Sequence, residues 1–133
     1  MANWYLHSGS VYRKQGIRKE NVLILGGMIV GFGDAADENR KLFQGPICDY
    51  DARGQIISPG FVDLHTHLRE PGWESKETIE SGTKAAVAGG FTTICPMPNT
   101  NPTVDSLDAL TDLEKRIRTT AQCRVRPIGA LTK

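Results

Sequence analysis

Cysteine is scarce in this chain, and neither sign of charge predominates. The three cysteines, Cys48, Cys95 and Cys123, lie far apart without C-x-x-C spacing, which indicates reduced thiols and excludes a disulfide framework or a zinc knuckle. The 16 Lys and Arg residues nearly balance the 15 Asp and Glu residues, so no strong field favours nucleic acid or an anionic membrane as a partner. We therefore expect a small-molecule substrate.

Long apolar runs and targeting signals are also lacking. The segment Met1–His7 shows no basic region followed by an apolar one, and no stretch approaches the roughly 18 apolar residues of a membrane span. We expect a cytoplasmic protein that does not contact a membrane. With 39% apolar and 23% charged residues over 133 positions, the composition is that of an ordinary globular chain with one modest core.

Residues 1–58 are dominated by short apolar runs between glycine-containing turns. This pattern is typical of consecutive hairpins. A polar stretch, 34–43, is either a short helix or a loop, and the runs 47–51 and 55–57 flank Ala-Arg-Gly as a further hairpin would. We predict a small antiparallel β subdomain over residues 1–58. Its first strands are expected at Trp4–Leu6, Val11–Arg13, Asn21–Leu25 and Met28–Phe32.

Two motifs suggest other functions but have simpler explanations. The stretch 31–36 fits the dinucleotide fingerprint G-x-G-x-x-A, with Asp49 and Asp51 roughly 20 residues on. The segment that follows lacks the apolar stripe with which a Rossmann helix packs on its sheet, so we interpret the glycines as turns. The basic cluster 115–118 has no interleaved aromatic residues and is interpreted as a solvated helix face.

From Ser58 onward, strand and helix patterns alternate. Gly89 and Gly90 predict a left-handed cap at the end of the first helix, and Asp105 or Ser106 caps the second. Such alternation predicts an α/β fold in which helices cover a parallel sheet. Residues 59–133 are then the first three β/α units of an incomplete (β/α)8 barrel. The expected elements are strands at Phe61–His67, Phe91–Pro96 and Cys123–Ile128, and helices at Lys76–Ala88 and from about Leu107 to Ile117.

The first strand of this region ends in His65-Thr66-His67. Residues two apart on a strand project from the same face at roughly 6.5–7 Å, so both imidazoles can bind one ion with Zn–N bonds of about 2.0–2.1 Å. An H-x-H sequence alone is a weak signal. Because Asp63 is expected on the same face, that face is unusually polar for a barrel interior, which favours metal binding by His65 and His67.

Two groups that can form paired hydrogen bonds follow adjacent strands. Arg69 lies just past the first strand, and Asn99 occupies the equivalent position after the second, in a loop stiffened by prolines. Taken singly, Arg69 could be a solvated loop arginine and Asn99 an asparagine of a turn. Because active sites of barrels lie at the carboxyl ends of the strands, we expect both to converge on a substrate carboxylate.

The sequence 58–72, together with 76–80, 88–93 and 97–100, closely resembles the dihydroorotase family of the amidohydrolase superfamily, in its longer bacterial type. The preceding hairpins resemble the small β subdomain of that superfamily, and Asp51-Ala52-Arg53-Gly54 its lead-in to the barrel. The resemblance implies that His65 and His67 bind zinc, as one or two ions. It also implies that Arg69 and Asn99 hold the carboxylate of the substrate, and that His67 contributes to substrate binding as well.

The implied reaction is the reversible hydrolysis of L-dihydroorotate to N-carbamoyl-L-aspartate in pyrimidine biosynthesis. The family's bridging ligand, two further histidines and the aspartate that shuttles the proton are expected beyond Lys133, which is not itself assigned as the bridging ligand. We therefore expect the chain alone to be an inactive fragment. Trp73 departs from the smaller or polar residue frequent in relatives.

Other functions stay open at this point. Allantoinase and dihydropyrimidinase share the implied fold, metal and H-x-H motif, but their rings lack the carboxylate that Arg69 and Asn99 would meet. The alternative outside the enzymes is a non-catalytic dihydroorotase-like protein that acts as an assembly partner. The resemblance is compatible with a homo-oligomer or with aspartate transcarbamoylase as a partner.

Overall fold

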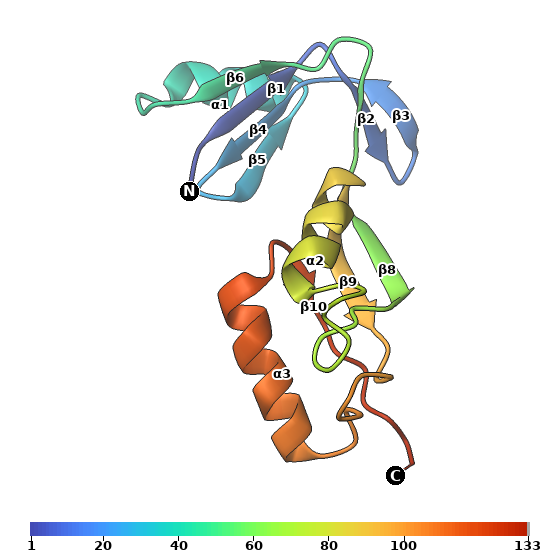
Figure 1. Cartoon of the computed structure of the whole chain (residues 1–133). Coiled ribbons are helices and arrows are strands. Elements are labelled where there is room, and N and C mark those ends of the chain that lie inside the picture. The colour runs from blue at the N-terminus through green and yellow to red at the C-terminus, as the bar shows by residue number, and fades with distance from the viewer. Residues whose placement is uncertain (133) are drawn as a thin grey trace. The chain divides into compact units, whose positions relative to one another are not determined.

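The computed structural model describes residues 1–132, and the chain divides into two compact units, Met1–Pro59 and Gly60–Lys133 (Figure 1). The expectation about Lys133 lies outside the described residues. Whether residues 1–58 and 59–133 are separate domains stays a prediction. Among the described residues, no helix has the length and apolar character needed to cross a membrane.

Met1–Pro59 forms two small sheets. The strands are β1 (Trp4–His7), β2 (Ser10–Arg13), β3 (Gly16–Lys19), β4 (Val22–Leu25), β5 (Met28–Phe32), β6 (Cys48–Asp51) and β7 (Ile56–Ile57). One sheet has the order β5-β4-β1-β6 and the other the order β3-β2-β7. The β4–β5 hairpin agrees with the predicted pattern, whereas β1 pairs antiparallel with β4 and not with β2, which lies in the other sheet. Val11, Val22 and Leu23 supply much of the buried apolar surface of this unit.

Two features of this unit differ from the expected hairpins. β6 pairs with β1 and β7 with β2, both in parallel, so the predicted hairpin between 47–51 and 55–57 is wrong and the unit is mixed rather than wholly antiparallel. The tight turn at 52–54, closed by Gln55 N donating to the Ala52 carbonyl at 2.9 Å, redirects the chain to the second sheet. β3 was not predicted, because all four of its residues are exposed and show no alternation.

The polar segment after β5 is a helix, α1 (Asp34–Leu42). It packs on the sheet through Ala36, which is fully buried, so one small residue replaces the apolar stripe that the sequence lacks. A Cβ atom on Gly31 would lie 2.8 Å from the backbone nitrogen of Ala36. Gly31 therefore permits close approach of helix and strand, and its interpretation as a turn residue is wrong.

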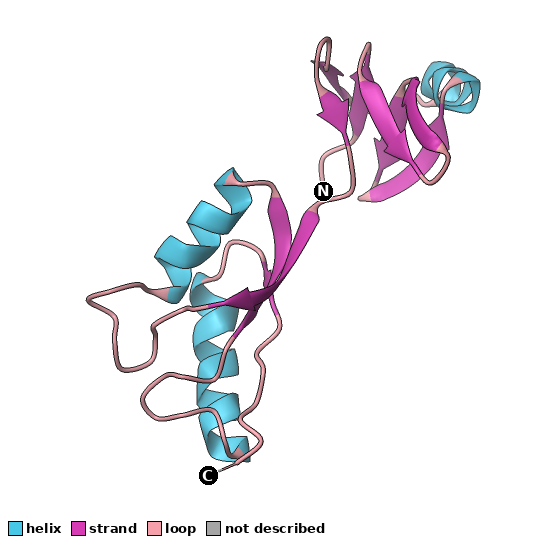
Figure 2. Ribbon diagram, turned by 90° about the vertical axis from the view of Figure 1, so that its right-hand side faces the viewer, coloured by secondary structure: helices cyan, strands magenta, loops and turns pink. Residues whose placement is uncertain are grey.

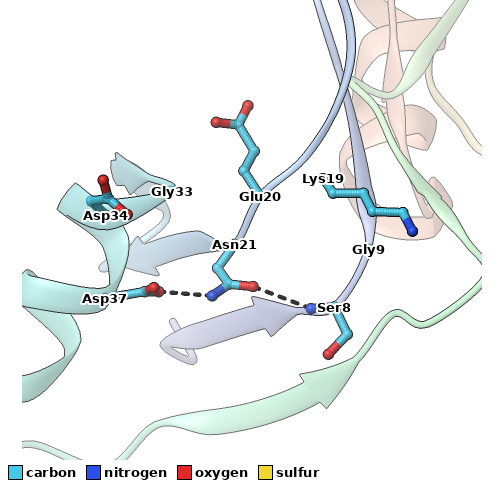
Figure 3. Close-up of a pocket in the computed structure, with 8 residues that line it drawn as sticks. All are labelled: Ser8, Gly9, Lys19, Glu20, Asn21, Gly33, Asp34 and Asp37. Carbon is cyan, nitrogen blue, oxygen red and sulfur yellow. Dashed lines mark hydrogen bonds between the residues drawn. The ribbon is translucent and has the colours of Figure 1, made fainter.

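A polar network joins α1 to β1. The Tyr5 hydroxyl donates to Asp37 Oδ1 at 2.7 Å, and Asn21 Nδ2 donates to the same oxygen at 2.8 Å. Asn21 Oδ1 accepts from the Ser8 backbone at 3.1 Å, and these residues border a polar pocket of about 260 Å³ (Figure 3). Burial, and then the Asp37 carboxylate, raise the pKa of Tyr5 to about 12, while hydrogen bonds from Asn21 and Tyr5 lower the pKa of Asp37.

Gly60–Lys133 contains a three-stranded sheet and two helices. The strands β8 (Phe61–Thr66), β9 (Phe91–Pro96) and β10 (Arg124–Val125) lie in the order β10-β9-β8, and both pairings are parallel. Helix α2 (Ile79–Ala88) connects β8 to β9, and α3 (Leu107–Thr120) connects β9 to β10. Figure 2 shows both helices alongside the strands. This arrangement confirms the predicted β/α alternation and the α/β class.

The helix ends follow from local hydrogen bonding. Thr78 and Ser81 form a capping box that starts α2 three residues later than expected, and Ser106, rather than Asp105, caps α3. The amide of Gly89 bonds back to the helix, and Gly90 has a φ of 83°, as the predicted left-handed cap requires.

The third strand is shorter than predicted. Only Arg124–Val125 is a strand, although the amides of Arg126 and Ile128 still donate to the carbonyls of Ile94 and Pro96 at 2.9 and 3.1 Å. The chain thus continues alongside β9 without regular strand geometry.

One apolar cluster holds the helices on the sheet of this unit. Its buried members come from the strands, both helices and the loops between them: Leu68, Ile79, Ile94, Val104, Leu113 and Val125. The hydroxyl of the fully buried Thr83 donates to the Ile79 carbonyl at 2.6 Å and accepts from the Gln122 amide at 3.0 Å. Thr83 therefore ties α2 to the segment that leads into β10.

We expect Thr83→Val to lower the free energy of unfolding by about 0.5–1.5 kcal/mol, because the partly buried Gln122 amide loses its acceptor. Thr83→Ser keeps the hydroxyl and is the control, expected to cost less. Urea unfolding of the two variants measures the difference. A Val variant at least as stable as the Ser variant would contradict the role of this hydroxyl.

The Tyr5 phenol should ionise only near pH 12, and this transition should be missing from the ultraviolet titration of Tyr5→Phe. Because the pKa is raised in the folded state, the contribution to stability is complete below about pH 10 and is lost as the pH rises toward 12. A Tyr5→Phe variant whose stability fell with pH as steeply as that of the unmodified chain would disprove this assignment.

Candidate functional site

His65 and His67 lie at the carboxyl end of β8 with their rings close together. The ring centres are 5.3 Å apart and the planes meet at 68°. Two imidazoles bound to one tetrahedral ion through bonds of about 2.0–2.1 Å have their centres roughly 5 Å apart. Both side chains are exposed, so the observed pair fits two ligands of a zinc site.

The strand that carries these histidines is irregular. Between Asp63 and Thr66 the pairing of β8 with β9 slips, so that three steps on β8 match two on β9. Asp63 Oδ1 accepts from the backbone amide of His65 at 3.0 Å. The prediction that Asp63 shares a face with both histidines assumed strict alternation along β8. The irregular pairing interrupts this alternation, because a bulge changes the direction of the side chains that follow Asp63.

Asn99 contacts the metal-ligand candidate directly. Its Oδ1 lies 3.1 Å from His67 Nδ1. An amide oxygen at this position accepts a hydrogen bond from the protonated Nδ1, and in that tautomer Nε2 of His67 has its lone pair free for a metal ion. The end of β8 and the loop after β9 thus bring His67 and Asn99 together, and His65 lies beside His67.

Arg69 lies in the loop after β8 and is half-buried. Its carbonyl accepts from the Trp73 amide at 2.9 Å, and within residues 1–132 its guanidinium forms no ion pair. The structure shows no contact between Arg69 and Asn99, so their joint grip on a carboxylate stays a prediction. Trp73 is exposed, and Lys76 Nζ lies 5.4 Å from its ring centre.

The loop after β8 is fastened by residues that the sequence did not single out. Glu70 accepts from the Ile79 backbone and pairs with Arg116 of α3. The prediction of a solvated helix face at 115–118 is wrong for Arg116, which forms ion pairs with Glu70, Glu74 and Asp112. No local sequence signal indicates Glu70, because it lies nine residues before Ile79 and reaches the start of α2 only through the fold of the loop.

Within residues 1–132, His65 and His67 are the candidate metal ligands. No group of three or more His, Cys, Asp or Glu side chains there is arranged to hold a metal ion. Protein zinc sites use three or four protein ligands. His65 and His67 could therefore supply two of the ligands of such a site.

The sequence model of the family described as Dihydro-orotase-like matches residues 54–133. The dihydroorotase of Staphylococcus epidermidis (strain ATCC 12228 / FDA PCI 1200) is 64% identical over 83 residues, which are 62% of this chain and 20% of that protein. The dihydroorotase of Staphylococcus aureus (strain MRSA252) is 46% identical over 127 residues, which are 96% of this chain and 29% of that protein. The chain spans less than a third of the length of these relatives.

Solved structures share the fold. The L-hydantoinase (dihydropyrimidinase) from Arthrobacter aurescens superposes with a TM-score of 0.83 at 23% identity, covering 97% of this chain and 28% of that one. The dihydropyrimidinase from Brevibacillus agri NCHU1002 gives a TM-score of 0.74 at 26% identity, covering 94% of this chain and 26% of that one. These matches confirm the predicted fold class, the opening β/α units of a hydrolase barrel preceded by a small β subdomain.

Proposed function

Because this chain belongs to the dihydro-orotase-like family, we propose that it supplies the first part of a zinc-dependent dihydroorotase. The whole protein would interconvert L-dihydroorotate and N-carbamoyl-L-aspartate in pyrimidine biosynthesis. The observation that carries this proposal is the paired arrangement of His65 and His67, with ring centres 5.3 Å apart and Asn99 bonded to His67. Its relatives by sequence and by fold are hydrolases of cyclic amides, which supports the reaction class.

His65 and His67 would hold the metal, as one or two zinc ions together with ligands from other parts of the protein. When bound, zinc supplies Lewis-acid polarisation of the ring amide carbonyl and acidifies water. The hydrogen bond from His67 Nδ1 to Asn99 fixes the tautomer in which Nε2 can bind metal. The aspartate that moves the proton to the leaving nitrogen would also come from elsewhere in the protein.

Arg69 and Asn99 would bind the substrate carboxylate. Within residues 1–132 no carboxylate neutralises Arg69, although its side chain is half-buried, and a guanidinium in that situation favours an anionic ligand. The carboxylate distinguishes dihydroorotate from the rings of dihydropyrimidinase and allantoinase substrates. Dihydropyrimidinase is the alternative that the structural matches support.

Assembly and location stay proposals. A homo-oligomer, a complex with aspartate transcarbamoylase and a non-catalytic assembly role are compatible with the family. A cytoplasmic location agrees with the three cysteines, none of which is in a disulfide.

We predict that His65→Ala and His67→Ala each remove most of the zinc and most of the activity from the whole protein, because each deletes one protein ligand. Zinc content is measured by elemental analysis beside turnover of dihydroorotate. His7→Ala, which changes a histidine of β1, is the control. Unchanged zinc and turnover in both variants would reject the metal site.

We predict that Arg69→Lys raises the KM for dihydroorotate or lowers kcat while the zinc content stays constant, because an ammonium group cannot form the paired hydrogen bonds of a guanidinium. Steady-state kinetics on dihydroorotate and on dihydrouracil, which lacks the carboxylate, provide the measurement. Equal rates on both rings in the unmodified protein would favour a dihydropyrimidinase instead.

We predict that the 133-residue polypeptide alone does not hydrolyse dihydroorotate, even with added zinc. Its barrel portion has a three-stranded sheet, whereas a complete barrel uses eight strands and about 250 residues. Apolar side chains of β8 are left exposed, with Leu64 at 71% and Val62 at 56%. Turnover by the purified polypeptide comparable to that of a full-length relative would refute this.

A further inference from the structure

Glu70, the residue after Arg69, connects the loop that follows β8 to both helices of its unit. Its side chain is only 15% exposed. Oε2 accepts from the backbone amide of Ile79 at 2.9 Å, at the first residue of α2. Oε1 lies 3.4 Å from Nη1 of Arg116, on α3. One carboxylate thus bridges two helices that are far apart in the sequence.

The chemistry of these contacts makes the carboxylate hard to replace. The N-terminus of a helix carries partial positive charge and unsatisfied amides, which favour an anion. The Thr78 side chain already accepts from Ser81, so the Ile79 amide depends on Glu70 for its partner. A nearly buried carboxylate in turn needs a cation, which Arg116 provides.

Arg116 is itself held in place. Its Nε donates to Asp112 Oδ2 at 2.9 Å, and its Nη1 lies 3.9 Å from Glu74 Oε1. Glu74 accepts from the Gly72 amide at 3.0 Å, within the same loop. The guanidinium therefore contacts the loop at two carboxylates, Glu70 and Glu74, from one fixed point on α3.

The other side of the loop is fixed against the segment after β9. The Pro71 carbonyl accepts from the Asn101 amide at 3.0 Å. Gly72 has a φ of 97°, and a Cβ atom there would collide with the backbone of Asn101. Because Asn101 lies two residues after Asn99, these contacts set the position of the Arg69 loop relative to the Asn99 loop.

We propose that Glu70, paired with Arg116, is the positioning residue that sets Arg69 for the substrate carboxylate. This inference rests on the proposed function, since it concerns the same carboxylate site. Neither Glu70 nor Arg116 touches substrate in this proposal. They act by holding the backbone from which Arg69 extends, so losing their ion pair weakens substrate binding more than the chemical step.

The test uses the whole protein with Glu70→Gln and Arg116→Gln. Glutamine at position 70 still offers an oxygen to the Ile79 amide but has no charge for Arg116. We expect each variant to raise the KM for dihydroorotate and the inhibition constant of orotate, which carries the same carboxylate, by about tenfold, with kcat changed less than about twofold and zinc retained. The double variant should bind no more weakly than Arg116→Gln alone, because Arg116→Gln already removes the ion pair with Glu70.

Arg116→Lys restores a cation at the same place and is expected to recover much of the affinity. The matched control is Arg118→Gln, on the same helix, which breaks only an exposed pair with Glu114 at 3.7 Å and should leave KM unchanged. If Glu70→Gln gives no folded protein, the comparison of Arg116→Gln with Arg116→Lys decides alone.

Unchanged KM in the folded Glu70→Gln and Arg116→Gln variants, beside a raised KM in Arg69→Lys, would overturn the positioning role and leave the proposed function standing. A lowered thermal midpoint without a change in KM would overturn it as well, because it would show a purely structural contact. No turnover of dihydroorotate by the unmodified zinc-loaded protein would refute the proposed function itself.

Discussion

The parallel pairing of β8 with β9 is the constraint on which the rest of the site depends. Parallel strands end at the same edge of a sheet, so the residues that follow them are neighbours in space although α2 separates them in sequence. This is why His67 and Asn99, 32 residues apart, meet at 3.1 Å. The apolar cluster around Ile94 and Leu113 holds the helices against this sheet and so keeps the pairing in place.

The sequence predicted this framework because its signals are local. The Gly89-Gly90 cap, the apolar spacing of α3 and the alternation of strand and helix each involve residues within a few turns of one another. Pairings that join distant segments were not predictable in the same way. The short β6 and β7 carry little pattern, and whether they pair with each other or with β1 and β2 depends on contacts about 45 residues away.

The candidate site also combines features that the local sequence indicates with features that depend on distant pairings. The spacing of His65 and His67 is visible in the sequence, and the rings do lie together. The bulge between Asp63 and Thr66 interrupts the alternation of side chains along β8. It arises from the pairing of β8 with β9, and the local sequence around Asp63 does not indicate it. The ion pair of Glu70 with Arg116 spans 46 residues, and a basic residue on an amphipathic helix shows no sign in the sequence of which carboxylate it will meet.

Asn99 links the two halves of the proposed chemistry through one amide group. Its oxygen is engaged by His67, at a distance of 3.1 Å, and an amide has two separate N–H donors on the other side. The same side chain can therefore hold His67, the proposed metal ligand, and donate to the proposed substrate carboxylate without giving up either bond. A rotation of this amide that improved its hydrogen bond with His67 would misalign its N–H groups for the proposed carboxylate, and the reverse also holds. A loop that must satisfy both demands needs a fixed backbone, which is what the contacts from Pro71 and Gly72 to Asn101 provide.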